Sequence, residues 1–233
     1  MRLADGGEEL ALDASGLLHW PARRLIVVAD LHLEKGAAYA RRGVPLPPYD
    51  TQATLDRLEA ALARLRPRPR AVVSLGDAFH DREGAARLDP ATAARLGNLT
   101  HAFAWTWVAG NHDPDPPAGL GGTAVPELRL GSLTFRHAPR GEPGEVAGHL
   151  HPKARVASTR LRLTRPCFAT DGRVLLLPAF GSLTGGLNVL DPAIAGLFPA
   201  GFAAFLLGEE RVFRVPHARL SPDPAAGLAQ RLA

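Results

Sequence analysis

Five short segments of the chain combine side chains that can bind metal ions. They are Asp30-Leu31-His32, Gly76-Asp77 with His80-Asp81, Gly110-Asn111-His112-Asp113, His137 and Gly148-His149-Leu150-His151. Carboxylate and amide oxygens are mixed with imidazoles, and no cysteine is placed among them. This ligand set suits two borderline-hard divalent ions such as Mn²⁺, Fe²⁺ or Zn²⁺. Paired ions roughly 3.5–4 Å apart are the usual means of in-line attack on a phosphate ester.

Each of the five segments follows, or ends, a short apolar run. The runs cover residues 25–29, 71–75, 105–109, 133–136 and 145–147. Short apolar runs closed by Gly or Asp are typical of buried strands. Side chains just past strand C-termini converge on the crevice where open α/β sheets bind their substrates. The sequence therefore predicts an α/β fold with its metal ligands at one edge of the sheet.

The spacing within the segments suggests separate roles for the ligands. Asp30 and His32 flank one leucine, and His149 and His151 flank another, so strand geometry would point each pair to one face. A carboxylate at Asp77 can bridge two cations, although a helix N-cap is its alternative role. His137 alone would more often be a structural histidine, but its place at a strand end favours a ligand.

The segment after residue 109 indicates a site for the substrate as well as the metal. Asn111 offers an uncharged oxygen ligand, and His112 can point at the substrate and donate a proton to the leaving oxygen. Asp113 can hold His112 in position; the alternative is a turn without chemistry. We expect His80 and Asp81 to orient a metal ligand by hydrogen bonding.

The remaining pattern predicts helices at residues 50–65, with Asp50 as N-cap, and at roughly 90–103. Hairpins are expected at residues 9–20, at 160–177 around Asp171-Gly172, and at 202–215. At 233 residues the chain fits one domain over residues 1–220, with a Pro- and Ala-rich tail at 221–233 that is expected to be poorly ordered.

Composition limits where the protein works and what it binds. No apolar run reaches 18 residues, no signal-peptide pattern opens the chain, and the single Cys167 fits a reducing compartment, so we expect a cytoplasmic protein and no membrane. The net charge of +4 comes almost wholly from arginine. A basic surface favours a polyanion such as DNA, but the abundance of Ala, Arg, Gly and Pro is an equally good explanation.

Taken in this order, the five segments resemble the calcineurin-like metallophosphoesterase superfamily over residues 30–151. The resemblance implies an αββα sandwich with a dinuclear site at the strand C-terminal ends. It implies a bridging hydroxide as nucleophile, His112 at the leaving group and Asp77 shared between the metals. One metal would be held by Asp30, His32, Asp77 and His151, and the other by Asp77, Asn111, His137 and His149.

A narrower resemblance covers most of the chain. The stretches 30–36, 42–51, 148–152, 165–168, 177–181 and 185–189 are similar to the ligase-associated DNA damage response endonuclease family, often called PdeM. This resemblance implies a manganese-dependent phosphodiesterase that acts on single-stranded DNA in repair. It also implies a repair helicase, an exonuclease-like protein and an ATP-dependent DNA ligase as partners.

The segment after His32 is the predicted contact with the strand. Basic groups beside an aromatic ring suit single-stranded nucleic acid, because charge holds the backbone and a ring can stack on bases. The residues are Lys35, Tyr39, Arg41 and Arg42, and Arg136, Arg140, Lys153 and Arg155 flank the other ligands and could extend the groove. A solvated basic loop is the alternative for each of them.

Two other functions compete with a DNA endonuclease. The first is a phosphodiesterase or phosphatase for a small molecule, such as a cyclic nucleotide or a nucleotide-derived ester, that uses the same two metals in a narrower pocket. The second is a scaffold without catalysis, which is disfavoured because His112 and all seven predicted ligands are present.

Overall fold

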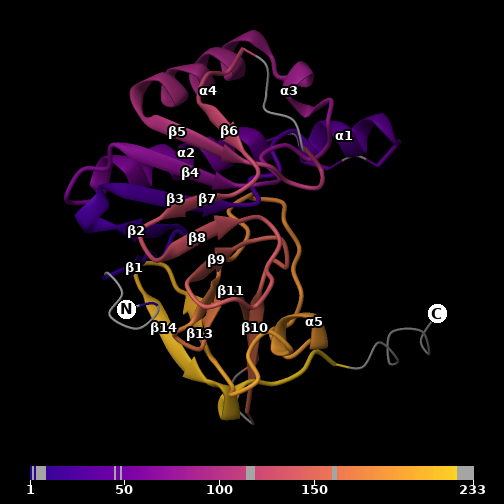
Figure 1. The fold of residues 1–233 in the computed structure, drawn as a ribbon. Coiled ribbons are helices and arrows are strands. Elements are labelled where there is room, and N and C mark those ends of the chain that lie inside the picture. The colour runs from indigo at the N-terminus through magenta and orange to yellow at the C-terminus, as the bar shows by residue number, and fades with distance from the viewer. Residues whose placement is uncertain are drawn as a thin grey trace.

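Two β-sheets pack face to face, and helices cover their outer faces (Figure 1). The structure is a computed structural model that describes the whole chain except residues 2, 4–8, 45, 48, 114–118, 159–161 and 225–233. The first sheet has the order β1 (Ala11–Leu12), β2 (Leu18–Trp20), β3 (Leu25–Ala29), β4 (Ala71–Leu75), β5 (Ala104–Val108) and β6 (Thr123–Val125). The four strands β3 to β6 run parallel, so their C-terminal ends lie at one edge.

The second sheet is mixed and forms the lower half of the molecule in Figure 1. Its order is β14 (Val212–Pro216), β13 (Ala203–Leu207), β11 (Arg162–Thr170), β12 (Val174–Leu176), β9 (Glu145–Ala147), β8 (Leu133–Arg136) and β7 (Leu128–Leu130). Strand β10 (Lys153–Ala157) pairs with the outer part of β11. The pair β8 and β9 is parallel, so the residues that follow these two strands also lie together.

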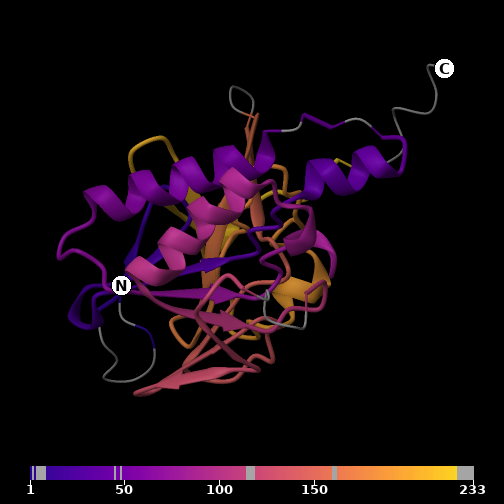
Figure 2. The ribbon, with the colours of Figure 1, turned by 90° about the horizontal axis from the view of Figure 1, so that it is seen from above.

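Helices flank this pair of sheets. They are α1 (Lys35–Arg41), α2 (Asp50–Arg64), α3 (Gly84–Arg87), α4 (Pro90–Ala102) and α5 (Pro192–Ala195), with short 3₁₀ turns at Pro21–Arg23 and His217–Arg219. Seen from above in Figure 2, α2 and α4 lie side by side over the first sheet, and Arg95 of α4 binds Asp56 and Glu59 of α2. Within the described residues, no helix combines the length and the apolar character needed to cross a bilayer.

Three apolar clusters fill the three interfaces between the four layers. Strand β3 shows how the alternation of a strand divides its side chains. Leu25, Val27 and Ala29 belong to the cluster between the sheets, whereas Ile26 and Val28 belong to the cluster under α2 and α4. The third cluster lies on the outer face of the second sheet and includes residues of β11, β12 and α5. The predicted αββα sandwich is confirmed.

The predicted helices and hairpins are confirmed, with a correction at the start of α2. Asp50 was expected to cap α2, but Tyr49 is the N-cap and Asp50 is the first helical residue. The Asp50 carboxylate instead accepts a hydrogen bond from the backbone N–H of Gly36 at 3.1 Å, and therefore links α2 to the first turn of α1. Helix α4 begins with a side-chain cap, because Asp89 accepts from the N–H groups of Ala91 and Thr92.

The start of the predicted tail packs against the body of the protein. The backbone N–H of Ser221 donates to the carbonyl of Arg155 at 2.8 Å. The amide of Asn188 donates to the carbonyl of Ser221 and to the carboxylate of Asp223, both at 3.0 Å. Residues 225–233 of that prediction lie outside the described residues.

Candidate metal centre

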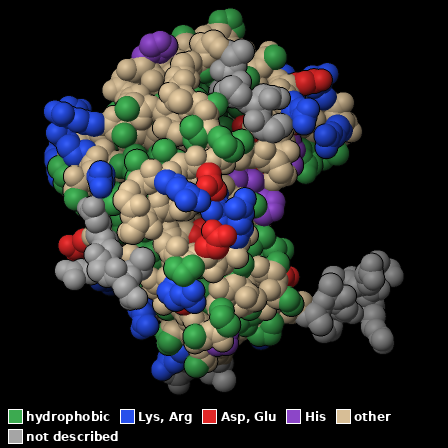
Figure 3. All heavy atoms as spheres, viewed as in Figure 1, with side chains coloured by type: hydrophobic (Ala, Val, Ile, Leu, Met, Phe, Trp, Pro, Cys, Tyr) green, Lys and Arg blue, Asp and Glu red, His purple; other side chains and the backbone are tan. Residues whose placement is uncertain are grey.

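The predicted ligands meet at the edge where both sheets end. Register pairs Ala29 with Leu75 and Leu75 with Val108, so the residues after β3, β4 and β5 come together. Register likewise pairs Arg136 with Ala147, which places the residues after β8 and β9 side by side. Figure 3 shows histidine side chains at the surface on the right of the view, where the two halves of the molecule meet.

One group of potential ligands consists of Asp30, His32 and His151, whose ligand atoms lie within 4.8 Å of one another. The Nε2 atoms of His32 and His151 are 3.3 Å apart. Asp30 Oδ1 lies 3.5 Å from Nε2 of His151. Asp30 and His32 are buried and His151 is partly exposed, so the group opens to solvent on the His151 side.

A second group consists of Asp77, His137 and His149. Nε2 of His137 lies 3.0 Å from Nδ1 of His149, 2.8 Å from Oδ1 of Asn111 and 3.4 Å from Oδ2 of Asp77. The same Asp77 oxygen lies 3.9 Å from Nε2 of His32, which belongs to the first group. Asp77 therefore stands between the two groups, where a bridging carboxylate must be.

The two groups fit divalent cations for a chemical reason. Burial, followed by the influence of neighbouring histidines, lowers the pKa of His32 to about 2, and burial also lowers the pKa of His149. Nε2 of His137 faces Nδ1 of His149 at 3.0 Å, and the Nε2 atoms of His32 and His151 face each other at 3.3 Å. Asp30 Oδ1 is buried without a hydrogen-bond partner. A divalent cation in each group would satisfy these lone pairs.

The backbone at the ligands differs from the strand geometry expected from the sequence. Asp30, His32, Asp77, His149 and His151 all have positive φ, at 53°, 44°, 45°, 68° and 44°. Side chains with a Cβ rarely occupy this region, and each such residue costs on the order of 1–3 kcal/mol. The paired ligands thus reach one site through left-handed turns instead of strand alternation.

His112 stands beside the metal centre with its ring partly open to solvent. Its backbone N–H donates to Asp77 Oδ1 at 2.9 Å, and its Nε2 lies 3.9 Å from Asp77 Oδ2. Nδ1 lies 2.9 Å from the backbone carbonyl of His80, and the two rings stack with centroids 5.6 Å apart. Since Nδ1 is engaged by the carbonyl, Nε2 is the nitrogen that a substrate can reach.

Two sequence-based assignments are wrong in detail. Asp113 was expected to hold His112, but its Oδ2 accepts the backbone N–H of Phe79 at 2.9 Å. Burial raises the pKa of Asp113 to about 7, against the effect of the Phe79 hydrogen bond, and the charge of Asp77 adds to the rise. Asp81 was expected to orient a ligand, but it forms an ion pair with Arg87 at 2.8 Å. The residue that orients His112 is His80, through its carbonyl.

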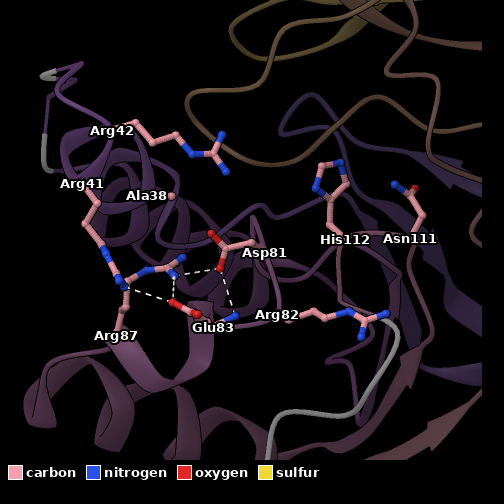
Figure 4. A pocket seen from close by; sticks show the side chains of 9 residues that line it. All are labelled: Ala38, Arg41, Arg42, Asp81, Arg82, Glu83, Arg87, Asn111 and His112. Atoms are coloured by element: carbon pink, nitrogen blue, oxygen red, sulfur yellow. Dashed lines mark hydrogen bonds and ion pairs between the residues drawn. The ribbon is translucent and has the colours of Figure 1, made fainter.

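A cleft of about 590 Å³ opens beside Asn111 and His112. Four arginines line it, and they are Arg41, Arg42, Arg82 and Arg87. Figure 4 shows Arg42 on one side of the cleft and the pair Asn111 and His112 on the other. Arg41 and Arg87 pair with Glu83, whereas Arg42 and Arg82 are exposed and form no ion pair with any carboxylate that the structure describes. We name this the arginine cleft.

The basic segment after His32 forms helix α1, and its side chains separate into two sets. Arg41 and Arg42 line the arginine cleft, as expected. Lys35 and Tyr39 instead pack toward His80, with the Lys35 ammonium 5.9 Å from the Tyr39 ring centre and that ring 5.5 Å from the His80 ring. Burial lowers the pKa of Lys35. Arg82 and Arg87 were missed, although Arg82 directly follows the His80-Asp81 segment and Arg87 lies in the short helix α3 after it.

The arginines that were expected to extend the groove near the other ligands have different surroundings. Arg136 is buried and binds Glu127, Glu142 and Glu145 at 2.8–3.2 Å, so it is a structural residue and not a groove residue. Arg155 donates to the carbonyl of Pro222 at 2.7 Å. Arg140 is exposed.

Replacing Arg136 with alanine is expected to lower the free energy of unfolding by about 1.5–3 kcal/mol, because the fully buried Glu145 loses its cation and keeps only the backbone N–H groups of residues 140–142. Chemical denaturation measures this change. The control is Arg129→Ala on the adjacent strand, where the arginine that pairs with Glu127 is exposed and a loss of about 0–1 kcal/mol is expected. If the Arg136→Ala variant instead bound DNA more weakly at unchanged stability, Arg136 would be a groove residue and not a structural one.

The metal-free protein is expected to lose stability as the pH falls below 6.5. Folded His32 stays neutral down to about pH 2, whereas the unfolded chain takes up the proton near pH 6.5, so acid favours the unfolded state. The free energy of unfolding should fall by about 1.4 kcal/mol per pH unit for this group between pH 6 and 5. Denaturation in chelator at pH 6 and pH 5 measures this change in the free energy of unfolding. In the His32→Gln variant, the slope of that free energy against pH should be smaller by the amount that corresponds to about one bound proton. An equal slope in that variant would contradict the assignment.

The fold and the site define a metal-dependent phosphodiesterase. A family model described as calcineurin-like phosphoesterase matches residues 23–171, which include every predicted ligand, and the chain belongs to this family. Among solved structures, the nuclease MPE of Pseudomonas putida is similar, with 32% sequence identity and a TM-score of 0.69. The match covers 92% of this chain and 99% of that one, in agreement with the resemblance to an endonuclease family.

Other comparisons add less. A conserved uncharacterized protein of Streptococcus pneumoniae, described as a predicted phosphoesterase, is 15% identical with a TM-score of 0.30, and the match covers 85% of this chain and 92% of that one. No curated protein sequence matches the chain.

Proposed function

We propose that the protein is an endonuclease that hydrolyses phosphodiester bonds of single-stranded DNA in DNA repair, with two Mn²⁺ ions at the metal centre. The observation that supports this most is the arginine cleft, which opens directly at Asn111 and His112. Its two unpaired guanidiniums, Arg42 and Arg82, suit the phosphates of a strand. An open, charged cleft favours a polymer over a small ester, which binds best in an enclosed and largely apolar pocket.

The roles of the side chains follow from their positions. When bound, two divalent ions supply Lewis-acid stabilisation of phosphate charge and an activated water. Asp30, His32 and His151 would hold one ion, Asn111, His137 and His149 the other, and Asp77 would bridge them. His112 presents Nε2 to the substrate because its Nδ1 lies at the His80 carbonyl. A proton at Nε2 is then placed for the leaving oxygen.

The wider setting of the activity is part of the proposal and rests on the resemblance. We propose that the enzyme works in the cytoplasm beside a repair helicase, an exonuclease-like protein and an ATP-dependent DNA ligase. Manganese is preferred because the resemblance implies it, and the proposed set of three amide or carboxylate oxygens and four imidazoles is compatible with it. Fe²⁺ and Zn²⁺ are the alternatives to compare.

The decisive experiment is cleavage of a labelled circular single-stranded DNA with Mn²⁺, beside bis-p-nitrophenyl phosphate. We expect the circle to be linearised, with no cleavage in chelator. Hydrolysis of the small ester while the circle stays intact would identify a small-molecule phosphodiesterase instead. Inactivity on both substrates in protein that binds two metals would overturn the proposal.

A further inference from the structure

A second cleft opens beside the metal centre. It has a volume of about 220 Å³ and reaches His151, whereas the arginine cleft reaches Asn111 and His112. Its further lining includes Lys153, Arg165, Thr164, Pro152 and Pro166. The two clefts share none of their lining residues, and each reaches a different residue of the metal centre, Asn111 for the arginine cleft and His151 for the second cleft.

The second cleft is built on rigid parts of the protein. One wall is the β10–β11 ladder, in which Lys153 pairs with Pro166 and Ala154 with Arg165. The other wall is the loop with Thr184 and Gly185. This loop packs tightly on the ligand segments, because a Cβ on Gly186 would lie 2.1 Å from the carbonyl oxygen of His151. The cleft is therefore fixed relative to the metal ligand at its end.

The side chains of this cleft suit one unit of a nucleic-acid strand. Lys153 and Arg165 both line the cleft and form no ion pair with any carboxylate among the described residues, so neither charge is neutralised within this part of the protein. The register places Lys153 on the same face of the ladder as Thr164 and Pro166, and Arg165 on the opposite face. Thr164 is exposed and can donate its hydroxyl proton. The rings of Pro152 and Pro166 give an apolar surface for a sugar or a base. Cations beside such a surface match a phosphate joined to a nucleoside.

We propose that the second cleft binds a phosphodiester of the substrate strand next to the one that is cut. A single strand would then run from the arginine cleft, across the metal centre, to Lys153 and Arg165. This inference rests on the proposed nuclease function and adds the path of the strand. It also accounts for cleavage within a strand, since both sides of the cut have a binding cleft.

The test is the double variant Lys153→Ala/Arg165→Ala, with Arg70→Ala as the matched control. Arg70 is exposed and lies just before β4, at the edge of the sheet away from the ligands. Binding of a single-stranded oligonucleotide is measured from about 0.05 to 0.3 M salt, in the His112→Ala background so that the strand stays intact. Hydrolysis of bis-p-nitrophenyl phosphate is measured in the otherwise native protein.

We expect the double variant to bind about 10- to 30-fold more weakly at 0.1 M salt, and the slope of log K against log salt to fall by about 1.4, since each lost phosphate contact removes about 0.7. The rate of small-ester hydrolysis by the double variant should stay within about twofold of the native rate. The oligonucleotide affinity of the Arg70→Ala control should also stay within about twofold of the native affinity. Lys153→Arg should retain binding because it keeps the charge.

Three results would overturn the inference. Unchanged affinity and slope in the double variant, with DNA cleavage by the native protein, would remove the second cleft from the strand path while leaving the nuclease function intact. Loss of small-ester hydrolysis in the double variant would show that the two residues support His151 instead. Absence of DNA binding and cleavage in the native protein would end the proposed function, and this inference with it.

Discussion

Replacing His112 with alanine is expected to slow cleavage of single-stranded DNA by about 10²–10⁴-fold, the usual contribution of a positioned general acid. The metal content should stay at the native level, because His112 lies outside both groups of ligands. Its Nε2 is the nitrogen open to the cleft, and its Nδ1 is fixed by the His80 carbonyl at 2.9 Å. Single-turnover cleavage and metal analysis of the same preparation measure both quantities.

The choice of ester separates proton donation from other roles of His112. A sugar alkoxide is a poor leaving group and needs a proton, whereas p-nitrophenolate leaves without one. The His112→Ala variant should therefore lose much less activity on bis-p-nitrophenyl phosphate than on DNA. Equal losses on both substrates would mean that His112 stabilises phosphate charge and does not protonate the leaving oxygen. Loss of bound metal in the His112→Ala variant would mean that His112 helps to hold the metal ligands in place.

Much of the metal centre follows from local patterns in the sequence. The run at residues 25–29 is apolar on both faces, which is typical of a strand buried between two layers, and the structure packs its faces into two different clusters. Its end at Asp30, and the glycines at 76 and 110, mark where parallel strands stop. Side chains at such ends must meet at one edge, so the ligand set could be predicted without long-range information.

What could not be predicted depends on contacts between distant segments. The segment Asp30-Leu31-His32 could form either a strand or a turn, and the positive φ values of Asp30 and His32 are set by the packing around them. Arg136 looks like a groove residue because the three glutamates that bury it meet it only when β8 pairs with β7 on one side and β9 on the other. Arg165 lies in the second cleft only because β10 folds back on β11.

The close packing of the ligand loops predicts a structural effect at the metal centre itself. A Cβ on Gly110 would lie 2.2 Å from the backbone nitrogen of Asp77 and 2.3 Å from its Oδ1, with Asp113 Oδ1 at 2.7 Å. Asp77 is the carboxylate placed between the two metal groups, so it has to move when a methyl group is added. Gly110→Ala should lower the free energy of unfolding by about 1–3 kcal/mol. It should also lower metal content and abolish phosphodiesterase activity, since both groups depend on Asp77.

The matched control is Gly97→Ala in α4, where an added Cβ meets nothing within 4 Å. A helix-interior glycine replaced by alanine should raise the free energy of unfolding by about 0.5–1 kcal/mol and leave metal binding unchanged. Denaturation curves and metal analysis of the two variants can be compared directly. Native metal content and activity in Gly110→Ala would show that the loop relaxes without moving Asp77, and the bridging position assigned to this carboxylate would then be wrong.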